Sequence, residues 1–178
     1  MIITLPSTAP LPVLSRVKLL SCDIDGVMTD GSIYYDKDGQ CMYKFHVLDG
    51  VGLKNAQKSG IRTCFISATL SDIISKRASV LGVDYCLLGC LDKLSALLRL
   101  TTEMDIPLSD VCHIADDVND LDLLQHVGFP VTVPNAHRDI LSACKFVTTR
   151  NGGSGAVRDL CDSLVESKKP LNENSFHR

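Results

Sequence analysis

The stretch VKLLSCDIDGV, residues 17–27, joins a short apolar run to two carboxylates and a glycine. A continuous apolar run of this kind is typical of a strand that is buried on both faces of a parallel sheet. Asp23 and Asp25 follow the run directly, and Gly26 allows the chain to leave the strand through a sharp turn. Buried carboxylates need a cation or hydrogen-bond donors, so the stretch predicts an acidic site at the end of a strand.

The rest of the chain alternates apolar runs with amphipathic helical patterns, which is typical of βαβ units. Strands are expected at 17–22, 62–66, 85–88, 111–115, 130–133 and 145–148. Helices are expected at 50–59, 71–81, 91–104, 120–127, 136–143 and 155–166. We therefore predict an α/β fold with a doubly wound, Rossmann-like parallel sheet, in which ligands bind at the carboxyl ends of the strands.

Residues 32–45 interrupt this alternation and predict a β-hairpin with Asp38-Gly39 at its turn. The hairpin follows the acidic end of the first strand, so we expect it to stand above the site as a flap. A single domain is expected over 17–166, after an N-terminal extension at 1–16 and before a mobile polar tail at 167–178.

Composition narrows the class of protein. The 178 residues are 45% hydrophobic and carry a net charge of -3, which argues against a nucleic-acid binder with a basic face. Neither a membrane-spanning run nor a signal-peptide pattern is present, so we expect a cytoplasmic protein. The eight cysteines are expected to be reduced thiols, since several lie in apolar runs predicted to be buried strands, namely Cys22, Cys64, Cys86 and Cys112.

The acids at the predicted strand ends suit phosphoryl chemistry. A carboxylate can attack phosphorus, and a second acid can protonate the leaving oxygen and later activate water. Asp116 and Asp117 end the fourth predicted strand and Asp120 follows them, so they should face the same crevice as Asp23 and share Mg²⁺ with it. Capping of the next helix explains Asp120 as well, and both interpretations can hold together.

Three further features allow two interpretations each. Ser67 can donate to a phosphate oxygen or cap a helix. Lys93 stands near a helix start, where its charge opposes the helix dipole, so we expect it to neutralise phosphate and hold the nucleophile unless it is simply solvated. The glycine-rich loop 151–155 suits an anion site or a flexible linker. His113 is interpreted as a core histidine.

Taken in order, Asp23-x-Asp25, Ser67, Lys93 and Asp116-Asp117-x-x-Asp120 resemble the motifs of the haloacid dehalogenase-like phosphatases. Over about residues 17–165 the chain is similar to the family of 3-deoxy-D-manno-octulosonate 8-phosphate phosphatases. The more specific parts of this resemblance are the hairpin at 33–44, FHVLDG at 45–50 and TRNGGSGAVR at 149–158.

This resemblance implies that Asp23 is the nucleophile and a metal ligand. Asp25 would be the general acid and base and would offer its backbone carbonyl to Mg²⁺, and Asp116 would complete the protein ligands. Ser67 and Lys93 would hold the phosphate, with Asp117 and Asp120 in supporting roles.

The resemblance also has implications for the substrate, the pathway and the subunit assembly. The substrate would be a phosphorylated sugar acid, hydrolysed through an aspartyl-phosphate in lipopolysaccharide biosynthesis. The family has no large cap domain, and it forms homotetramers in which hairpins meet and a neighbouring subunit helps to close each site.

One departure from the family concerns the sugar. Relatives usually carry Thr-Gly-Arg or Ser-Gly-Arg after the second strand, whereas this chain has Ser67-Ala68-Thr69. An arginine there would suit a substrate carboxylate, so the change leaves a nonulosonate (sialic-acid-like) 9-phosphate as an alternative substrate. Asp49 and Gly50 are further candidates for substrate binding, and the arginines that can replace the missing one are Arg62, Arg77, Arg150 and Arg158.

Two other classes of protein are considered. A non-catalytic oligomerisation domain, related to those fused to sugar nucleotidyltransferases, would not need Asp23, Asp25 and Asp116 together. A phospho-receiver domain should carry its acceptor aspartate after the middle strand, where this chain has Ser67, and the long hairpin does not fit it.

Overall fold

Strand β2 (Leu19–Cys22) lies inside a seven-stranded sheet with the order β1-β9-β8-β7-β2-β5-β6, in which all neighbouring strands are parallel. The structure is a computed structural model that describes residues 2–7 and 11–169. All four residues of β2 are buried, because β5 and β7 pair with it on either side. The buried parallel strand that the opening stretch predicts is therefore confirmed.

The predicted strands all form, two of them with the expected bounds and the others with bounds that differ by one or two residues. They are β5 (Arg62–Ile66), β6 (Tyr85–Leu87), β7 (Val111–Ala115), β8 (Phe129–Thr132) and β9 (Phe146–Thr148). Cys86 is exposed rather than buried, because β6 is an edge strand of the sheet. All eight cysteines are free thiols.

The sequence analysis did not predict β1 (Ile3–Leu5), which lies in the segment expected to be an extension. Its three residues are too few to show a strand pattern, yet they pair with β9 and form the other edge of the sheet. The 3₁₀-helix η1 (Pro12–Arg16) follows and buries Leu14 in the main core. The extension is thus partly integrated into the sheet and the core.

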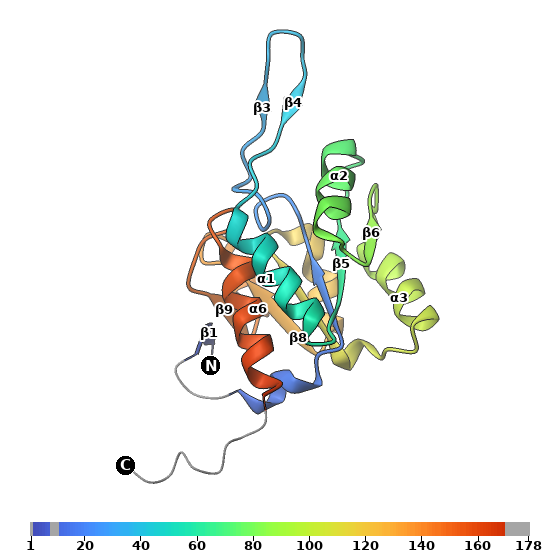
Figure 1. Cartoon of the computed structure of the whole chain (residues 1–178), viewed down its shortest axis with the longest axis vertical. Helices are drawn as coiled ribbons and strands as arrows, with labels where there is room; N and C mark the ends of the chain where they lie inside the picture. The colour runs from blue at the N-terminus through green and yellow to red at the C-terminus, as the bar shows by residue number, and fades with distance from the viewer. Residues whose placement is uncertain (1, 8–10, 170–178) are drawn as a thin grey trace.

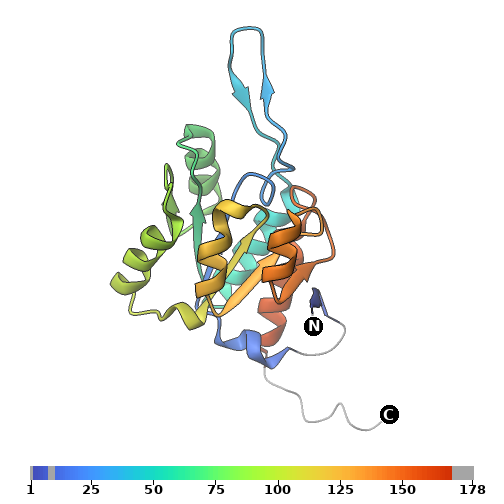
Figure 2. The same ribbon diagram turned by 180° about the vertical axis from the view of Figure 1, so that it is seen from behind.

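Helices cover both faces of the sheet (Figures 1 and 2). On one face, α1 (Val47–Lys58), α2 (Asp72–Leu81) and α6 (Ala156–Ser167) pack into the largest apolar cluster. On the other face, α3 (Lys93–Glu103) and α4 (Leu121–His126) share a second cluster, and α4 shares a third with α5 (Arg138–Ala143). Short 3₁₀-helices precede β7 and α4, namely η2 (Leu108–Asp110) and η3 (Val118–Asp120). The doubly wound architecture is confirmed.

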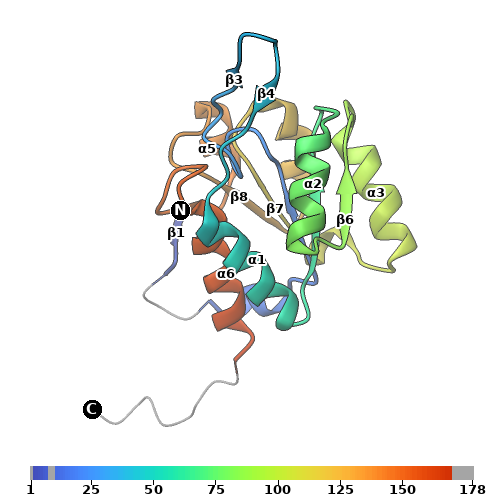
Figure 3. The same ribbon diagram turned by 45° about the horizontal axis from the view of Figure 1, so that its top comes forward.

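The predicted hairpin is also confirmed, as an antiparallel pair of β3 (Tyr34–Tyr35) and β4 (Cys41–Met42). Gly39 adopts a φ of 77° at the turn, a conformation that favours glycine. The hairpin projects from the edge of the sheet at which the site lies, and no second domain accompanies it in the described residues (Figures 1 and 3).

Two further predictions concern the C-terminal tail and membrane-spanning segments. Helix α6 ends at Ser167, and the predicted tail lies outside the described residues from 170 onward. Within the described part of the chain, no helix has the length and apolar character needed to cross a membrane.

Candidate active site

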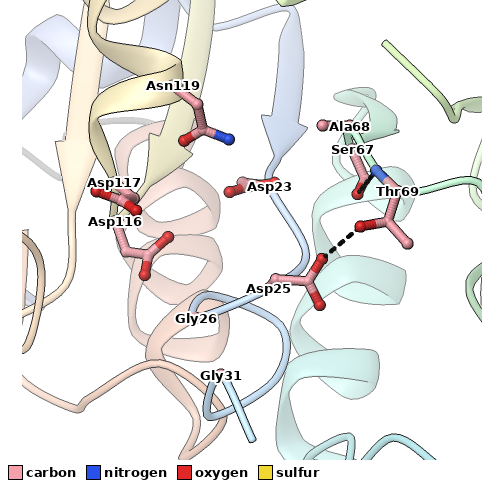
Figure 4. Close-up of a pocket in the computed structure, with 10 residues that line it drawn as sticks. All are labelled: Asp23, Asp25, Gly26, Gly31, Ser67, Ala68, Thr69, Asp116, Asp117 and Asn119. Atoms are coloured by element: carbon pink, nitrogen blue, oxygen red, sulfur yellow. Dashed lines mark hydrogen bonds between the residues drawn. The ribbon is translucent and has the colours of Figure 1, made fainter. Parts of the chain in front are cut away.

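Three parallel strands end at one crevice of about 230 Å³. Asp23 follows β2, Ser67 follows β5 and Asp116 follows β7. Asp23 occupies the middle, with Asp116 on one side of it and Ser67 on the other (Figure 4). The crevice is lined by Asp23, Asp25, Gly26, Gly31, Ser67, Ala68, Thr69, Asp116, Asp117 and Asn119.

Lys93 holds the carboxylate of Asp23 from below the crevice. Its Nζ lies 2.8 Å from Asp23 Oδ1 and 2.6 Å from Asp120 Oδ2. Asp92 accepts a hydrogen bond from Ser95 N and caps α3, so the lysine is the first residue of the helix. Lys93 and Asp23 are only 3% and 4% exposed, respectively, so this ion pair is shielded from water. The unfavourable position of Lys93 at a helix start is explained by its two buried carboxylate partners.

Burial raises the pKa of Asp23 to about 8, and the charge of Asp120 adds to this effect, whereas Lys93 opposes it. Burial and the charges of Asp117 and Asp120 raise the pKa of Asp116 to about 6. Burial is the larger cause of both shifts, and the neighbouring carboxylates, which outnumber the one ammonium, add to it. The crevice therefore favours an additional cation.

The residues present fit Mg²⁺. Within the described ranges, no three Asp, Glu, His or Cys side chains stand close enough to hold a metal by side chains alone. Mg²⁺ commonly takes one or two carboxylates and keeps waters and phosphate oxygens as its other ligands. Asp23 and Asp116 both line the crevice, so two carboxylates are available there as ligands of this kind. Asp116 lies directly over Gly26, where an added Cβ would meet its Oδ2 at 1.9 Å.

The loop after Asp25 is held by its neighbours. Thr29 Oγ1 accepts hydrogen bonds from Gly26 N at 3.3 Å and from Gly31 N at 3.2 Å. The glycine-rich loop packs on it from outside, since a Cβ on Gly152 would lie 1.7 Å from the carbonyl oxygen of Gly26. Gly153 N donates to Val27 O at 2.9 Å. The glycines of loop 151–155 thus permit a close backbone contact that supports the acidic loop.

Thr69 is a site residue whose role the sequence analysis did not assign. Its Oγ1 donates to Asp25 Oδ2 at 3.3 Å, and its backbone N donates to Ser67 Oγ at 3.0 Å (Figure 4). In the sequence, the hydroxyl of Thr69 in the Ser67-Ala68-Thr69 triplet was the feature that could have indicated this contact. Thr69 therefore contacts the predicted general acid from the position at which the family resemblance leads us to expect an arginine.

Four further candidates are not among the residues that line the crevice. Asp49 is fully buried in α1, and its Oδ1 accepts a hydrogen bond from Arg158 N at 2.9 Å. Arg77 Nη2 donates to His46 O at 3.4 Å, and a Cβ on Gly50 would meet the same nitrogen at 3.2 Å. These residues connect α1 with α2 and α6, and substrate binding by them remains a prediction.

The other two candidate arginines have carboxylate partners. Arg62 Nη1 lies 2.8 Å from Asp84 Oδ1, and Arg150 Nε lies 3.6 Å from Asp159 Oδ1. Neither arginine is among the residues that line the crevice.

Comparison with known proteins agrees with this geometry. Residues 89–160 match a family model described as haloacid dehalogenase-like hydrolase. The chain is 34% identical to 3-deoxy-D-manno-octulosonate 8-phosphate phosphatase KdsC of Yersinia pestis, over 88% of this chain and 84% of the relative.

Solved structures of such proteins are also similar. One is 3-deoxy-D-manno-octulosonate 8-phosphate phosphatase from Moraxella catarrhalis in complex with a magnesium ion, a phosphate ion and a KDO molecule. It is 35% identical with a TM-score of 0.85, covering 88% of this chain and 90% of that one. A cobalt-bound form of the Haemophilus influenzae phosphatase is 31% identical with a TM-score of 0.84, covering 88% and 91%.

The buried carboxylate of Asp49 predicts a measurable pH dependence of stability. Burial raises its pKa from 3.8 to about 6, and its Oδ2 has no hydrogen-bond partner among the described residues. The unfolded chain therefore releases this proton first, and the contribution of Asp49 to stability is lost as the pH rises from about 4 to 6. We expect the stability of Asp49→Asn relative to wild type to increase by about 3 kcal/mol over this range.

Urea unfolding of the metal-free proteins at several pH values measures this difference. Asp84→Asn is the matched control, because hydrogen bonds from Arg62 and Thr63 lower the pKa of Asp84 although burial opposes them. The stability of Asp84→Asn relative to wild type should decrease as the pH rises, and it should do so at pH values below about 4. A constant difference between Asp49→Asn and wild type from pH 4 to 7 would contradict the assignment.

Proposed function

The chain belongs to the haloacid dehalogenase-like hydrolases, in the family of the 3-deoxy-D-manno-octulosonate 8-phosphate phosphatases, and we propose that it hydrolyses this sugar phosphate to the free sugar acid and phosphate. It is a phosphoric monoester hydrolase that uses Mg²⁺. The observation that carries the proposal is the shielded pair of Asp23 and Lys93 at the base of a crevice that Ser67 also lines.

Asp23 is the nucleophile in this proposal. Lys93 binds Oδ1, so Oδ2 is the oxygen that we assign to attack on phosphorus. A bond from this oxygen to phosphorus forms while the bond from phosphorus to the sugar oxygen breaks. Ser67, which lines the crevice, donates to a phosphate oxygen, and Lys93, which lies behind Asp23, neutralises the phosphate and holds the nucleophile in line with phosphorus.

Asp25 moves the protons. In its protonated form it gives a proton to the departing sugar oxygen, and as a carboxylate it then takes a proton from water. The water oxygen attacks phosphorus, and the bond to Asp23 breaks to release phosphate. The hydrogen bond from Thr69 fixes one carboxylate oxygen of Asp25, which leaves the other oxygen to exchange the proton.

Asp23, Asp116 and the backbone carbonyl of Asp25 would hold Mg²⁺. When bound, Mg²⁺ supplies positive charge that keeps the nucleophile ionised and offsets the negative charge of the phosphoryl group. Asp117 and Asp120 support this set. Asp117 Oδ1 accepts from Val118 N at 2.7 Å, and Asp120 is ion-paired to Lys93.

The sugar is the less constrained part of the substrate. The crevice lining includes no arginine, lysine or histidine, so a sugar carboxylate would need a cation from elsewhere. Arg77 and Arg158 are our candidates from this subunit, with Asp49 and Gly50 placing them. The guanidinium of Arg77 lies 5.4 Å from the ring centre of Phe45 at the base of the hairpin. A nonulosonate 9-phosphate is the alternative substrate for the same reason.

We propose a homotetramer in which the hairpins meet. Apolar side chains on the hairpin are about half exposed or more, at 49% for Tyr34, 69% for Tyr35 and 57% for Met42. Tyr34 and Met42 are direct partners on the two strands, and exposed apolar side chains that lie together favour an interface. The same assembly would shield a crevice that this subunit leaves open. A cytoplasmic location and a step in lipopolysaccharide biosynthesis complete the proposal.

A non-catalytic oligomerisation domain is the competing function. The arrangement of the site argues against it, because an assembly role does not require a buried lysine between two carboxylates. Burying these charges has a cost in stability that a reaction would explain.

The first test is a substrate panel. We expect kcat/KM for 3-deoxy-D-manno-octulosonate 8-phosphate to exceed that for glucose 6-phosphate by about a hundredfold or more, because a site that binds a carboxylate discriminates against substrates without one. The nonulosonate 9-phosphate and p-nitrophenyl phosphate complete the panel. A higher value for the nonulosonate would select the alternative substrate, and equal values for all sugars would contradict a sugar-acid phosphatase.

The second test replaces the nucleophile. Asp23→Asn should lower kcat by about a thousandfold or more, because the amide has nearly the same shape but cannot attack phosphorus. Asp122→Asn is the control, since its carboxylate is 70% exposed on α4. Steady-state kinetics and thermal unfolding are measured on each variant. Substantial turnover by a folded Asp23→Asn protein would rule out the assigned nucleophile.

The third test removes the metal. Chelation followed by dialysis should abolish turnover, and added Mg²⁺ should restore it. Asp116→Asn should raise the Mg²⁺ concentration for half-maximal activity by about tenfold or more, because it replaces a charged ligand by a neutral one. Unchanged activity after chelation would contradict the metal requirement, and an unchanged Mg²⁺ requirement in Asp116→Asn would remove that residue from the ligand set.

A further inference from the structure

A continuous line of buried polar side chains runs behind the crevice on the face of the sheet that α3 and α4 cover. Ser21 Oγ lies 3.2 Å from His113 Nδ1, and His113 Nε2 lies 2.9 Å from Asp120 Oδ1. Asp120 Oδ2 lies 2.6 Å from Lys93 Nζ, which in turn lies 2.8 Å from Asp23 Oδ1. The line thus connects two residues of the sheet interior with the nucleophile.

The sheet register creates this line. Ser21 and His113 are direct partners on the parallel strands β2 and β7, so their side chains lie side by side on the same face. Both are fully buried, as is Asp120. Leu19 and Val111, two residues earlier on the same strands, point to this face and are apolar. Polar residues thus replace apolar ones where the strands approach the site.

The hydrogen bonds define the state of each group. A carboxylate oxygen only accepts, so His113 Nε2 carries the hydrogen that Asp120 Oδ1 receives. In the neutral imidazole, His113 Nδ1 then accepts the hydroxyl hydrogen of Ser21. Both oxygens of Asp120 are occupied, one by His113 and the other by Lys93, so its carboxylate cannot rotate without losing a partner.

From this geometry we propose that His113 and Ser21 are positioning residues for Lys93. Ser21 orients His113, His113 fixes the carboxylate of Asp120, and Asp120 sets the ammonium of Lys93 against Asp23. Without the histidine donor, Asp120 Oδ1 would be a buried and unpaired acceptor, and the carboxylate would turn towards Lys93. The ammonium would then move away from the nucleophile and the phosphate. This inference rests on the proposed phosphatase reaction.

The test compares two replacements of the histidine. His113→Phe keeps an aromatic ring but removes the donor to Asp120, and we expect kcat for p-nitrophenyl phosphate to fall by about tenfold to a hundredfold. His113→Gln places an amide donor near the position of Nε2, and its kcat should stay within about threefold of wild type. The KM should change by less than about threefold in both variants, because the chemical step is affected more than binding.

A double-mutant cycle separates positioning from general destabilisation. If His113 acts through Asp120, then His113→Phe should lower kcat by less than about twofold in an Asp120→Asn background. Thr101→Val is the matched control. It removes a buried hydroxyl that donates to Leu98 O, and Thr101 lies about two turns of α3 beyond Lys93. It should lower the melting temperature but leave kcat unchanged. Equal kcat for wild type and folded His113→Phe, equal losses in the Phe and Gln variants, or additive losses in the cycle would overturn the proposal.

Nuclear magnetic resonance of the metal-free protein tests the line without any turnover. Long-range ¹H–¹⁵N spectra should show His113 as the Nε2–H tautomer, and Ser21→Ala should weaken or shift this preference. An Nδ1–H tautomer in wild type would overturn the inference, even if His113→Phe does not fold. A wild-type protein that shows the predicted tautomer but hydrolyses no phosphate ester would instead contradict the proposed function.

Discussion

The arrangement of the site depends on one buried ammonium between two buried carboxylates. Lys93 lies within 2.8 Å of Asp23 and 2.6 Å of Asp120, and all three side chains are almost inaccessible to water. A buried charge is stable only with partners, so each member of this set restricts where the others can lie. The start of α3, the end of β2 and η3 must therefore meet at one point.

Negative charge still exceeds positive charge around that point. Asp116 and Asp117 add to the carboxylates of Asp23 and Asp120, and burial raises the pKa of Asp23 and Asp116. A site with this excess of negative charge is suited to a divalent cation, and to a phosphate that binds together with that cation. The same imbalance makes the lysine essential, because it is the cation that the fold itself supplies at the nucleophile.

Close backbone contacts hold together the loops that carry these charged residues around the crevice. Gly26 leaves room for Asp116, and Gly152 leaves room for the carbonyl of Gly26. Thr29 ties both ends of the acidic loop together. Side chains larger than hydrogen would separate these segments, so the glycines determine how closely Asp116 and loop 151–155 approach the loop after Asp25. The glycine-rich loop, for which the sequence allowed an anion site or a linker, is a packing element here.

The sequence by itself determined the fold class and the enzyme family of this protein, because apolar runs, turn glycines and motif acids act over a few neighbouring residues. It predicted six of the seven strands, the hairpin, and the gathering of Asp23, Ser67 and Asp116 at one edge. Only the tertiary structure decided the individual atomic contacts between distant side chains. Strand register pairs Ser21 with His113, the packing of α3 brings Lys93 to Asp23, and the turn after β5 brings Thr69 to Asp25. Such contacts depend on how whole elements pack, and no local pattern in the chain encodes them.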